Sequence, residues 1–318
     1  MQLASPCSHP LLWHLPALVL VCVKLACQHR LPPLASSPLI TISSIFQMAT
    51  RLFEGKSHAS HYQKYRLSPP QKIQDLILNY LGNRLKKPFG LAVDVGCGTG
   101  QTSRSLVPYF QKVLGTDISE AQIEQANHAD GFPNLVYRVS AAEEIPAENA
   151  SVDLITACAA VHWFDIEKFL KEADRVLKPC GCLAFFTYLP NMEVHYKHQS
   201  QQLTQVITEL QDVLSPYVHE KVQHVISGYK DIFNAIPYTD KKRVENIDSK
   251  ISMSLKDMLG LIQTFSMYQT FLSFEPEKAK DLVKTTEQRF LEIMQVSSSE
   301  EIIELRLNNV CVLASKPE

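Results

Sequence analysis

Three glycines at alternate positions are the chemically most informative residues of the chain. Gly96, Gly98 and Gly100 follow the largely apolar run Leu91–Val95, and a helix-like segment begins directly after them. Glycine has no Cβ, so such a loop brings bare backbone close to a ligand, and the free amides of a helix start bind polar ligand atoms. The pattern predicts a strand, a tight loop and a helix that together hold a nucleotide-like molecule.

The spacing of the glycines narrows the choice of ligand. The run reads G-x-G-x-G, and residue 101 is Gln101, where the dinucleotide fingerprint G-x-G-x-x-G needs its third glycine. A nicotinamide oxidoreductase is therefore disfavoured. Asp94 stands two residues before the first glycine, and this acid-plus-glycines pattern resembles motif I of the class I S-adenosylmethionine-dependent methyltransferases.

The resemblance implies S-adenosyl-L-methionine as the cofactor and assigns residues to its parts. Motif I wraps the methionine half, and the matching positions are Asp94, Gly96, Cys97, Gly98 and Gly100. An acid at the end of the second strand accepts hydrogen bonds from both ribose hydroxyls in the family, and a carboxylate suits a diol because it has two acceptor oxygens.

Asp117 matches that acid by position, and Ser119 already serves as the cap of the following helix. Ile118 is expected either beside the adenine ring or in the core. Many relatives have Asp at the position of Ala141, where it contacts the adenine amino group. This chain departs from them, so we expect the backbone of Ala142 and the side chain of Glu143 to contact adenine instead.

The hypotheses for catalysis are based on two runs that contain aromatic residues. The loop from Cys158 to Trp163 would face the sulfonium and the acceptor, and His162 would orient the acceptor or take its proton. The competing interpretation is that His162 is a structural histidine beside Trp163.

The run His61–Arg66, together with His162–Asp165, resembles segments of the trans-aconitate type of methyltransferase. That resemblance implies that Tyr62 covers the methionyl group and that Arg66 binds a carboxylate. A surface arm packed on the sheet is the alternative for residues 61–66.

The elements needed to position these residues follow from periodicity. An amphipathic helix precedes the glycines, and apolar strands then alternate with helices up to a strand over Cys182–Leu189. This alternation predicts an α/β fold with a doubly wound parallel sheet, in which ligands bind beyond the carboxyl ends of the strands. The resemblance implies a Rossmann-like, mostly parallel seven-stranded sheet with a helical insertion.

The predicted domains are a cofactor-binding core over 48–190, a helical substrate or lid region over 191–300, and a strand over 301–318 that rejoins the sheet. We expect residues 1–47 to be an extension without ordered structure, because they contain no Asp or Glu and six of the 18 prolines. A signal or anchor segment and a mitochondrial presequence are the alternatives for this extension.

Composition limits the classes of partner. The formal net charge of -2 gives no overall basic field, so nucleic acid is not an expected partner, and Lys241–Arg243 is interpreted as a solvated loop. The eight cysteines of the chain lack the spacing of zinc ligands, which predicts reduced thiols, a cytoplasmic protein and no metal site. Leu15–Val23 is too short to span a bilayer, which needs roughly 20 apolar residues.

The leading hypothesis is methyl transfer to a small-molecule acceptor, with a carboxylate as one candidate group. A catalytically inactive cofactor-binding or interaction protein is the main alternative, and a methyltransferase of a protein or RNA substrate is another.

Overall fold

A computed structural model describes residues 53–129 and 131–318 of the chain. The chain divides into two compact units, Met1–Ile45 and Phe46–Glu318, and the first unit lies outside the described residues. The predicted extension over residues 1–47 therefore also lies outside them. The fold and the candidate site belong to the second unit.

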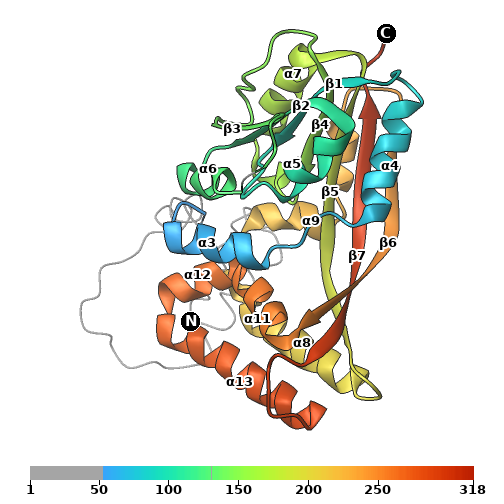
Figure 1. Cartoon of the computed structure of the whole chain (residues 1–318). Coiled ribbons are helices and arrows are strands. Elements are labelled where there is room, and N and C mark those ends of the chain that lie inside the picture. Colours follow the sequence, from blue (N-terminus) through green and yellow to red (C-terminus); the bar gives the residue numbers. More distant parts are fainter. Residues whose placement is uncertain (1–52, 130) are drawn as a thin grey trace, which may run out of the picture. The chain divides into compact units, whose positions relative to one another are not determined.

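One mixed sheet forms the centre of this unit. Its strands are β1 (Phe89–Val95), β2 (Phe110–Asp117), β3 (Leu135–Val139), β4 (Val152–Cys158), β5 (Leu177–His195), β6 (Lys241–Ser254) and β7 (Ile302–Ser315). These seven strands of the described chain are ordered β3-β2-β1-β4-β5-β7-β6 (Figure 1). The first five pair in parallel, whereas β7 is antiparallel to both β5 and β6. The predicted doubly wound, mostly parallel sheet is confirmed.

Helices connect and cover the strands. They are α3 (Lys56–Tyr65), α4 (Gln71–Gly82), α5 (Gln101–Leu106), α6 (Glu120–Asn127), α7 (Ile166–Val176), α8 (Ser200–Leu214), α9 (Gln223–Ile226), α10 (Lys230–Ala235), α11 (Leu255–Gln263), α12 (Ser266–Phe274) and α13 (Pro276–Met294). Short 3-10 turns are η1 (Val107–Tyr109), η2 (Val161–Trp163), η3 (Ser215–Tyr217) and η4 (Glu220–Val222). Ser119 caps α6 and Asp165 caps α7, as the sequence predicts.

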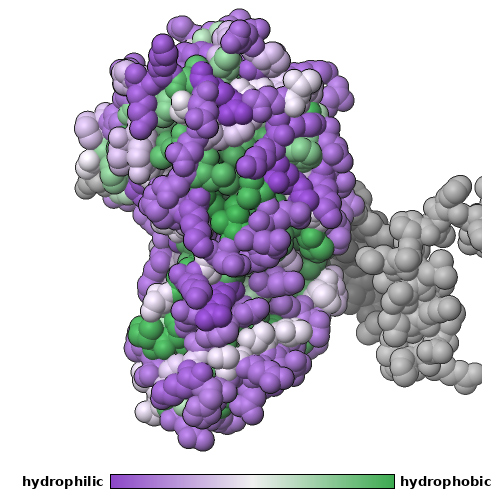
Figure 2. All heavy atoms as spheres, turned by 90° about the vertical axis from the view of Figure 1, so that its right-hand side faces the viewer, coloured by the Kyte–Doolittle hydropathy of each residue, from purple (hydrophilic) through white to green (hydrophobic). Residues whose placement is uncertain are grey.

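The central parallel strands β1 and β4 are covered on both faces, and successive residues of each strand point to opposite faces. On one face Ala92 packs in a cluster with residues of α4 and α5, and on the other Val93 packs with residues of α7 and α10. The α4 side is less completely covered: Leu76 and Leu78 stay partly buried at the border of their cluster. Figure 2 shows hydrophobic side chains gathered in the middle of the face that carries α4, surrounded by hydrophilic ones.

A second core lies where β5, β6 and β7 extend past the other strands. Met192 and Val194 of β5 and Leu305 of β7 pack there against α8, α11, α12 and α13 (Figure 1). The helices α8, α11, α12 and α13 therefore form a helical layer on an extension of the same sheet. The long strands connect this layer to the parallel part of the sheet.

The region 191–300 is not wholly helical, which corrects the prediction. Lys241–Arg243, interpreted as a solvated loop, lies at the start of the edge strand β6. The Nζ atom of Lys241 donates to the carbonyl oxygens of Phe233 at 2.9 Å and Ile236 at 2.8 Å. The sequence does not show this strand by an alternation of apolar and polar residues, because an exposed edge strand needs few apolar side chains. A register shift between Val244 and Ile247 interrupts the pattern further.

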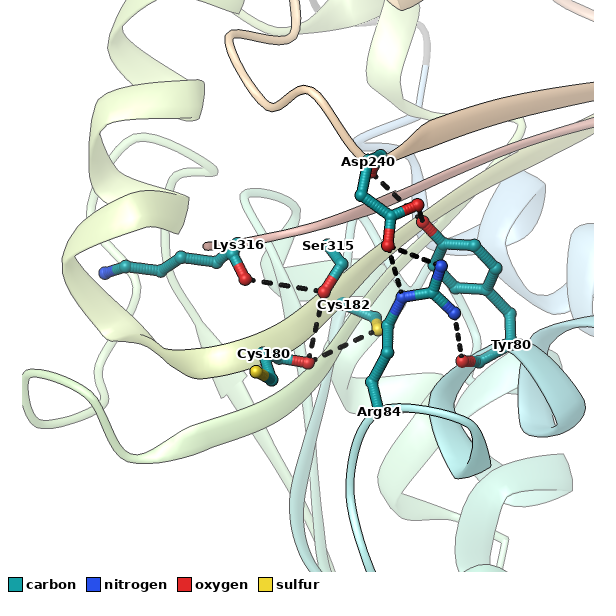
Figure 3. Close-up of polar contacts among 7 residues, drawn as sticks. All are labelled: Tyr80, Arg84, Cys180, Cys182, Asp240, Ser315 and Lys316. Carbon is teal, nitrogen blue, oxygen red and sulfur yellow. Dashed lines mark hydrogen bonds and ion pairs between the residues drawn. The ribbon is translucent and has the colours of Figure 1, made fainter. Parts of the chain in front are cut away.

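A polar cluster fixes β6 to α4 at the start of the strand (Figure 3). Asp240 accepts hydrogen bonds from the Nε of Arg84 at 2.8 Å and from the hydroxyl of Tyr80 at 3.0 Å. The Arg84 guanidinium lies 3.4 Å from the centre of the Tyr80 ring. These contacts connect residues 160 positions apart and explain a strand that local sequence does not indicate.

Candidate functional site

The glycine loop leaves β1 in a conformation that favours glycine at all three positions. Gly96, Gly98 and Gly100 have φ values of 65°, 55° and 86°. These lie in the left-handed region, which other residues adopt only with strain. The loop then enters α5, and Cys97 between the first two glycines is buried. The strand, tight loop and helix therefore follow one another as the sequence predicts, and the contacts of the loop with a cofactor stay a prediction.

Asp94 is buried behind this loop, where it contacts other side chains of the protein rather than a ligand. Its carboxylate has no exposed surface, and it accepts hydrogen bonds from the hydroxyls of Ser103 at 2.6 Å and Thr156 at 2.8 Å. Burial raises the pKa of Asp94 to about 6. The predicted direct cofactor contact of Asp94 is thus corrected: the residue joins β1, β4 and α5 beneath the loop.

Asp117 ends β2 beside the glycine loop. One carboxylate oxygen accepts the amide of Gly98 and the other accepts the amide of Ser119, both at 2.9 Å. Burial raises the pKa of Asp117, and these backbone hydrogen bonds oppose the rise. Each oxygen keeps further acceptor capacity, because a carboxylate oxygen accepts more than one hydrogen bond. The position and chemistry fit a ligand with two neighbouring hydroxyls.

An apolar side chain adjoins this acid. Ile118 is 73% exposed, so the interpretation that it belongs to the core is wrong. Ala142 is buried in the core cluster, so only its backbone amide and carbonyl groups can form hydrogen bonds. The Oε1 atom of Glu143 accepts the backbone amide of Asp165 at 2.7 Å, ahead of α7. The adenine contacts predicted for Ala142 and Glu143 stay predictions.

Helix α3 covers the glycine loop. The Tyr62 ring lies so close to Gly98 that a Cβ there would be 3.3 Å from its Cε1. At the start of the helix, the carbonyl of Phe53 accepts the hydroxyl of Ser119 at 2.9 Å, and Lys56 pairs with Glu124 at 2.8 Å. Interactions with α6 and the end of β2 therefore hold the first half of α3 over the site.

The other side of α3 packs on the helical layer. His61 is 3.1 Å from the carbonyl oxygen of Gly260 in α11, and the Tyr65 ring occupies the space that a side chain at Gly260 would need. The guanidinium of Arg66 lies 4.7 Å from the Tyr62 ring centre and 5.4 Å from that of Phe265. The segment 61–66 thus lies between the glycine loop and the helical layer.

His162 does not have the surroundings of a general base. It is 6% exposed, and its Nδ1 is 3.0 Å from the hydroxyl of Tyr229, which is itself fully buried. Burial, reinforced by nearby positive side chains that include His224 and Arg66, lowers the pKa of His162 to about 3. Such an imidazole stays neutral and accepts protons poorly near pH 7. The prediction of His162 as a base is corrected in favour of a structural histidine.

Cys158 is the last residue of β4, the strand next to β1 in the sheet. Burial raises the pKa of its thiol to about 12, so the thiol stays protonated near pH 7 and is a poor nucleophile. The five cysteines of the described chain are free thiols.

The described residues contain no cluster of His, Cys, Asp and Glu side chains of the kind that holds a metal ion. In the same residues no helix is long and apolar enough to cross a membrane.

Sequence analysis did not single out three aromatic residues near the site: Phe53, Tyr188 and Phe265. Phe53 and Trp163 have ring centres 6.1 Å apart, and Tyr188 at the end of the regular part of β5 stacks near Phe265 at 6.1 Å. The pairing of β5 with β7 is irregular between Tyr188 and Met192, and this irregularity is the structural reason for the position of Tyr188. No local sequence pattern marks the irregularity.

Comparison with known proteins identifies the reaction that this site belongs to. A family model described as a methyltransferase domain matches residues 93–185. A Dictyostelium discoideum protein assigned to the methyltransferases is 32% identical over 206 residues, which cover 62% of this chain and 72% of that protein. The chain belongs to the class I S-adenosylmethionine-dependent methyltransferases.

Other relatives agree with this assignment. A Saccharomyces cerevisiae protein assigned to the S-adenosylmethionine-dependent methyltransferases is 23% identical over 244 residues, 69% of this chain and 82% of the yeast protein. A solved structure from Anaeromyxobacter dehalogenans, assigned as a type II methyltransferase, has 25% identity and a TM-score of 0.62, covering 80% of this chain and all of that one. The methyltransferase uses S-adenosylmethionine, and the narrower resemblance to the trans-aconitate type stays a prediction.

Proposed function

We propose that this methyltransferase acts on a small-molecule acceptor, which it encloses between the glycine loop and α3. The observation that carries the proposal is the burial of the loop beneath Tyr62: Cys97 is 7% exposed and Thr99 has no exposed surface. Such burial favours a small acceptor over a folded protein or an RNA helix. Enclosure also excludes water, which favours transfer to the intended acceptor.

We assign the cofactor to the carboxyl ends of β1, β2 and β4. The backbone of the Gly96–Gly100 loop would lie against the methionine half, and Asp117 would accept the ribose hydroxyls. Ile118 and the backbone of Ala142 would contact the adenine, with Glu143 at its border. This assignment is supported by the free acceptor capacity of Asp117 and by the 73% exposed Ile118 next to it.

The acceptor group that suits this site is a carboxylate. S-adenosylmethionine supplies an electrophilic methyl group whose leaving group is a neutral thioether. The protein must then align the nucleophile with that methyl and keep water out. A carboxylate is already ionised near pH 7 and needs no base, and His162 with its lowered pKa is unsuited to be one.

We propose the cytoplasm as the compartment, because the five described cysteines are all free thiols. The balanced charge supports a small molecule rather than nucleic acid as the partner.

Two experiments test the function. Calorimetry compares binding of S-adenosylmethionine, S-adenosylhomocysteine and NAD, and we expect binding of the first two alone. Mass spectrometry then follows methyl transfer into a metabolite extract, with protein and RNA fractions as parallel samples. Methylated product confined to protein or RNA would contradict the proposal, and binding without transfer in any fraction would favour an inactive binding protein.

A further inference from the structure

The two outer strands of the sheet differ in how their free edges are protected. An edge strand presents unpaired backbone N–H and C=O groups, and proteins guard such edges with charged side chains and with bulges. The edge strand β6 has both, because Lys242 and Lys250 are exposed on it and its register with β7 is interrupted. At the opposite edge β3 pairs within the described chain with β2 alone, and its register is regular from Leu135 to Val139 (Figure 1). Arg138 is its single charged residue.

Backbone groups on the outer side of β3 have no partner in the described chain. The amide of Ser140, directly after the strand, donates to the carbonyl of Asp117 at 3.0 Å. Because alternate residues of a strand in a parallel pair bond to the same neighbour, the residues that face away from β2 are Leu135, Tyr137 and Val139. The amide of Leu135 is used in the preceding turn, at 3.1 Å. The carbonyls of all three residues and the amides of the last two are therefore available to pair with another strand.

Apolar side chains accompany these backbone groups. Val136 is 52% exposed and Val139 is 49% exposed, although valine is a residue that is usually buried. Ile118, which follows the partner of Val139 in β2, is 73% exposed. A single exposed valine needs no explanation, but a group of apolar side chains along an unpaired edge is typical of an interaction surface.

A second copy of β3 fits this edge in one antiparallel register. When Tyr137 pairs with Tyr137 of the second copy, the outward backbone groups of both strands face each other and form about four hydrogen bonds. Val136 then lies opposite Arg138 of the second copy, and twofold symmetry repeats this pair. The single charge of the strand therefore faces a valine and never itself, whereas like charges directly opposite each other destabilise a sheet. The edge thus complements itself in both hydrogen bonding and charge.

We infer that β3 is the surface through which two copies of this chain form a dimer with one continuous sheet. The inference does not depend on the identity of the methyl acceptor. Since the paired strands run in opposite directions, the segment before β3 of the second copy lies at the carboxyl end of β3, where Ile118 is exposed. The dimer therefore also covers Ile118, beside the acid that ends β2.

The test measures the oligomeric state of the full chain by sedimentation velocity over a range of concentrations. Val136→Lys places two lysines opposite the two Arg138 residues of the dimer, and Val136→Glu places an acid there instead. Both variants remove the same valine, so the proposed register is what separates them. Val213→Lys is the matched control, because Val213 is 47% exposed on α8. Melting curves establish that each variant is folded.

We expect the wild type to dimerise with a dissociation constant on the order of 10 µM, since one short strand pair buries little area. Val136→Lys should weaken the dimer about tenfold or more, and Val136→Glu should stay within about threefold of the wild type, as should Val213→Lys. Hydrogen exchange of the wild type should show the amides of Tyr137 and Val139 slowing severalfold as concentration rises. Amides on the free edge of β6 should not change.

Three results would overturn the inference. A chain that stays monomeric throughout the range does not form this dimer. A dimer that Val136→Lys and Val136→Glu affect equally is joined by another surface or in another register. Slow exchange of the Tyr137 and Val139 amides at every concentration shows that the edge is already covered within a single chain.

Discussion

The ring of Tyr137 occupies the place where a side chain at Gly100 would begin. A Cβ on Gly100 would lie 2.0 Å from the Tyr137 hydroxyl oxygen and 2.6 Å from its Cζ. The ring cannot move aside easily, because its other edge packs on Gly115, where a Cβ would be 2.5 Å from Cδ1. The last glycine of the loop is therefore required by packing against β3 as well as by its backbone conformation.

Gly100→Ala should destabilise the fold through both effects. The left-handed backbone alone costs about 1–2 kcal/mol for alanine, and the collision with Tyr137 adds about 1–3 kcal/mol of overpacking. Gly131→Ala is the matched control, since Gly131 has φ of +100° but nothing within 4 Å of the added Cβ. Urea unfolding measures both variants, and equal losses of unfolding free energy would show that the Tyr137 contact is unimportant.

Asp117→Asn should weaken cofactor binding on the order of 100-fold. The variant keeps the shape of the side chain but removes the charge from two proposed hydrogen bonds to the ribose, which are worth about 1.5 kcal/mol or more each. Calorimetry with S-adenosylhomocysteine measures the effect. The exposed Asp212→Asn serves as the control. An unchanged dissociation constant for Asp117→Asn would remove this residue from the binding site.

Asp94 should make stability depend on pH. Its pKa is raised from 3.8 to about 6, so the folded protein holds this proton more tightly than the unfolded chain does. The associated stabilisation is complete below about pH 4 and is lost as pH rises through 6, on the order of 3 kcal/mol in total. Asn cannot ionise, so the stability of wild type relative to Asp94→Asn should fall by this amount between pH 4 and pH 7. Denaturant unfolding at each pH measures it, and a constant difference would contradict the assignment.

His162→Phe should affect stability more than the pH profile of catalysis. The imidazole is buried, its pKa is lowered to about 3, and its Nδ1 is used by Tyr229. We expect a lower melting temperature and an unchanged shape of the kcat/KM profile between pH 6 and pH 9. Tyr229→Phe removes the same hydrogen bond from the other side and should resemble it. Loss of a limb of the profile in His162→Phe alone would restore the histidine as a base.

Local sequence was a good guide wherever one segment determines its own conformation. The glycine spacing, the caps Ser119 and Asp165 and the buried strand β4 are such cases, since backbone freedom, side-chain capping and hydrophobic burial act within a few residues. Local sequence failed for β6, which pairs with β7 some 60 residues away and is anchored to α4 through Arg84 and Asp240.

For the site, the sequence alone determined the family chemistry: a strand, a glycine loop and an acid at the end of the next strand. Tertiary structure decided the roles of individual side chains. Asp94 and His162 have structural roles because they are buried and their polar atoms are hydrogen-bonded within the protein. Tyr188 and Phe265 come from distant segments and lie beside the site. The reason is physical: pKa values and hydrogen-bond partners depend on burial and on neighbours from other elements, which a linear sequence does not contain.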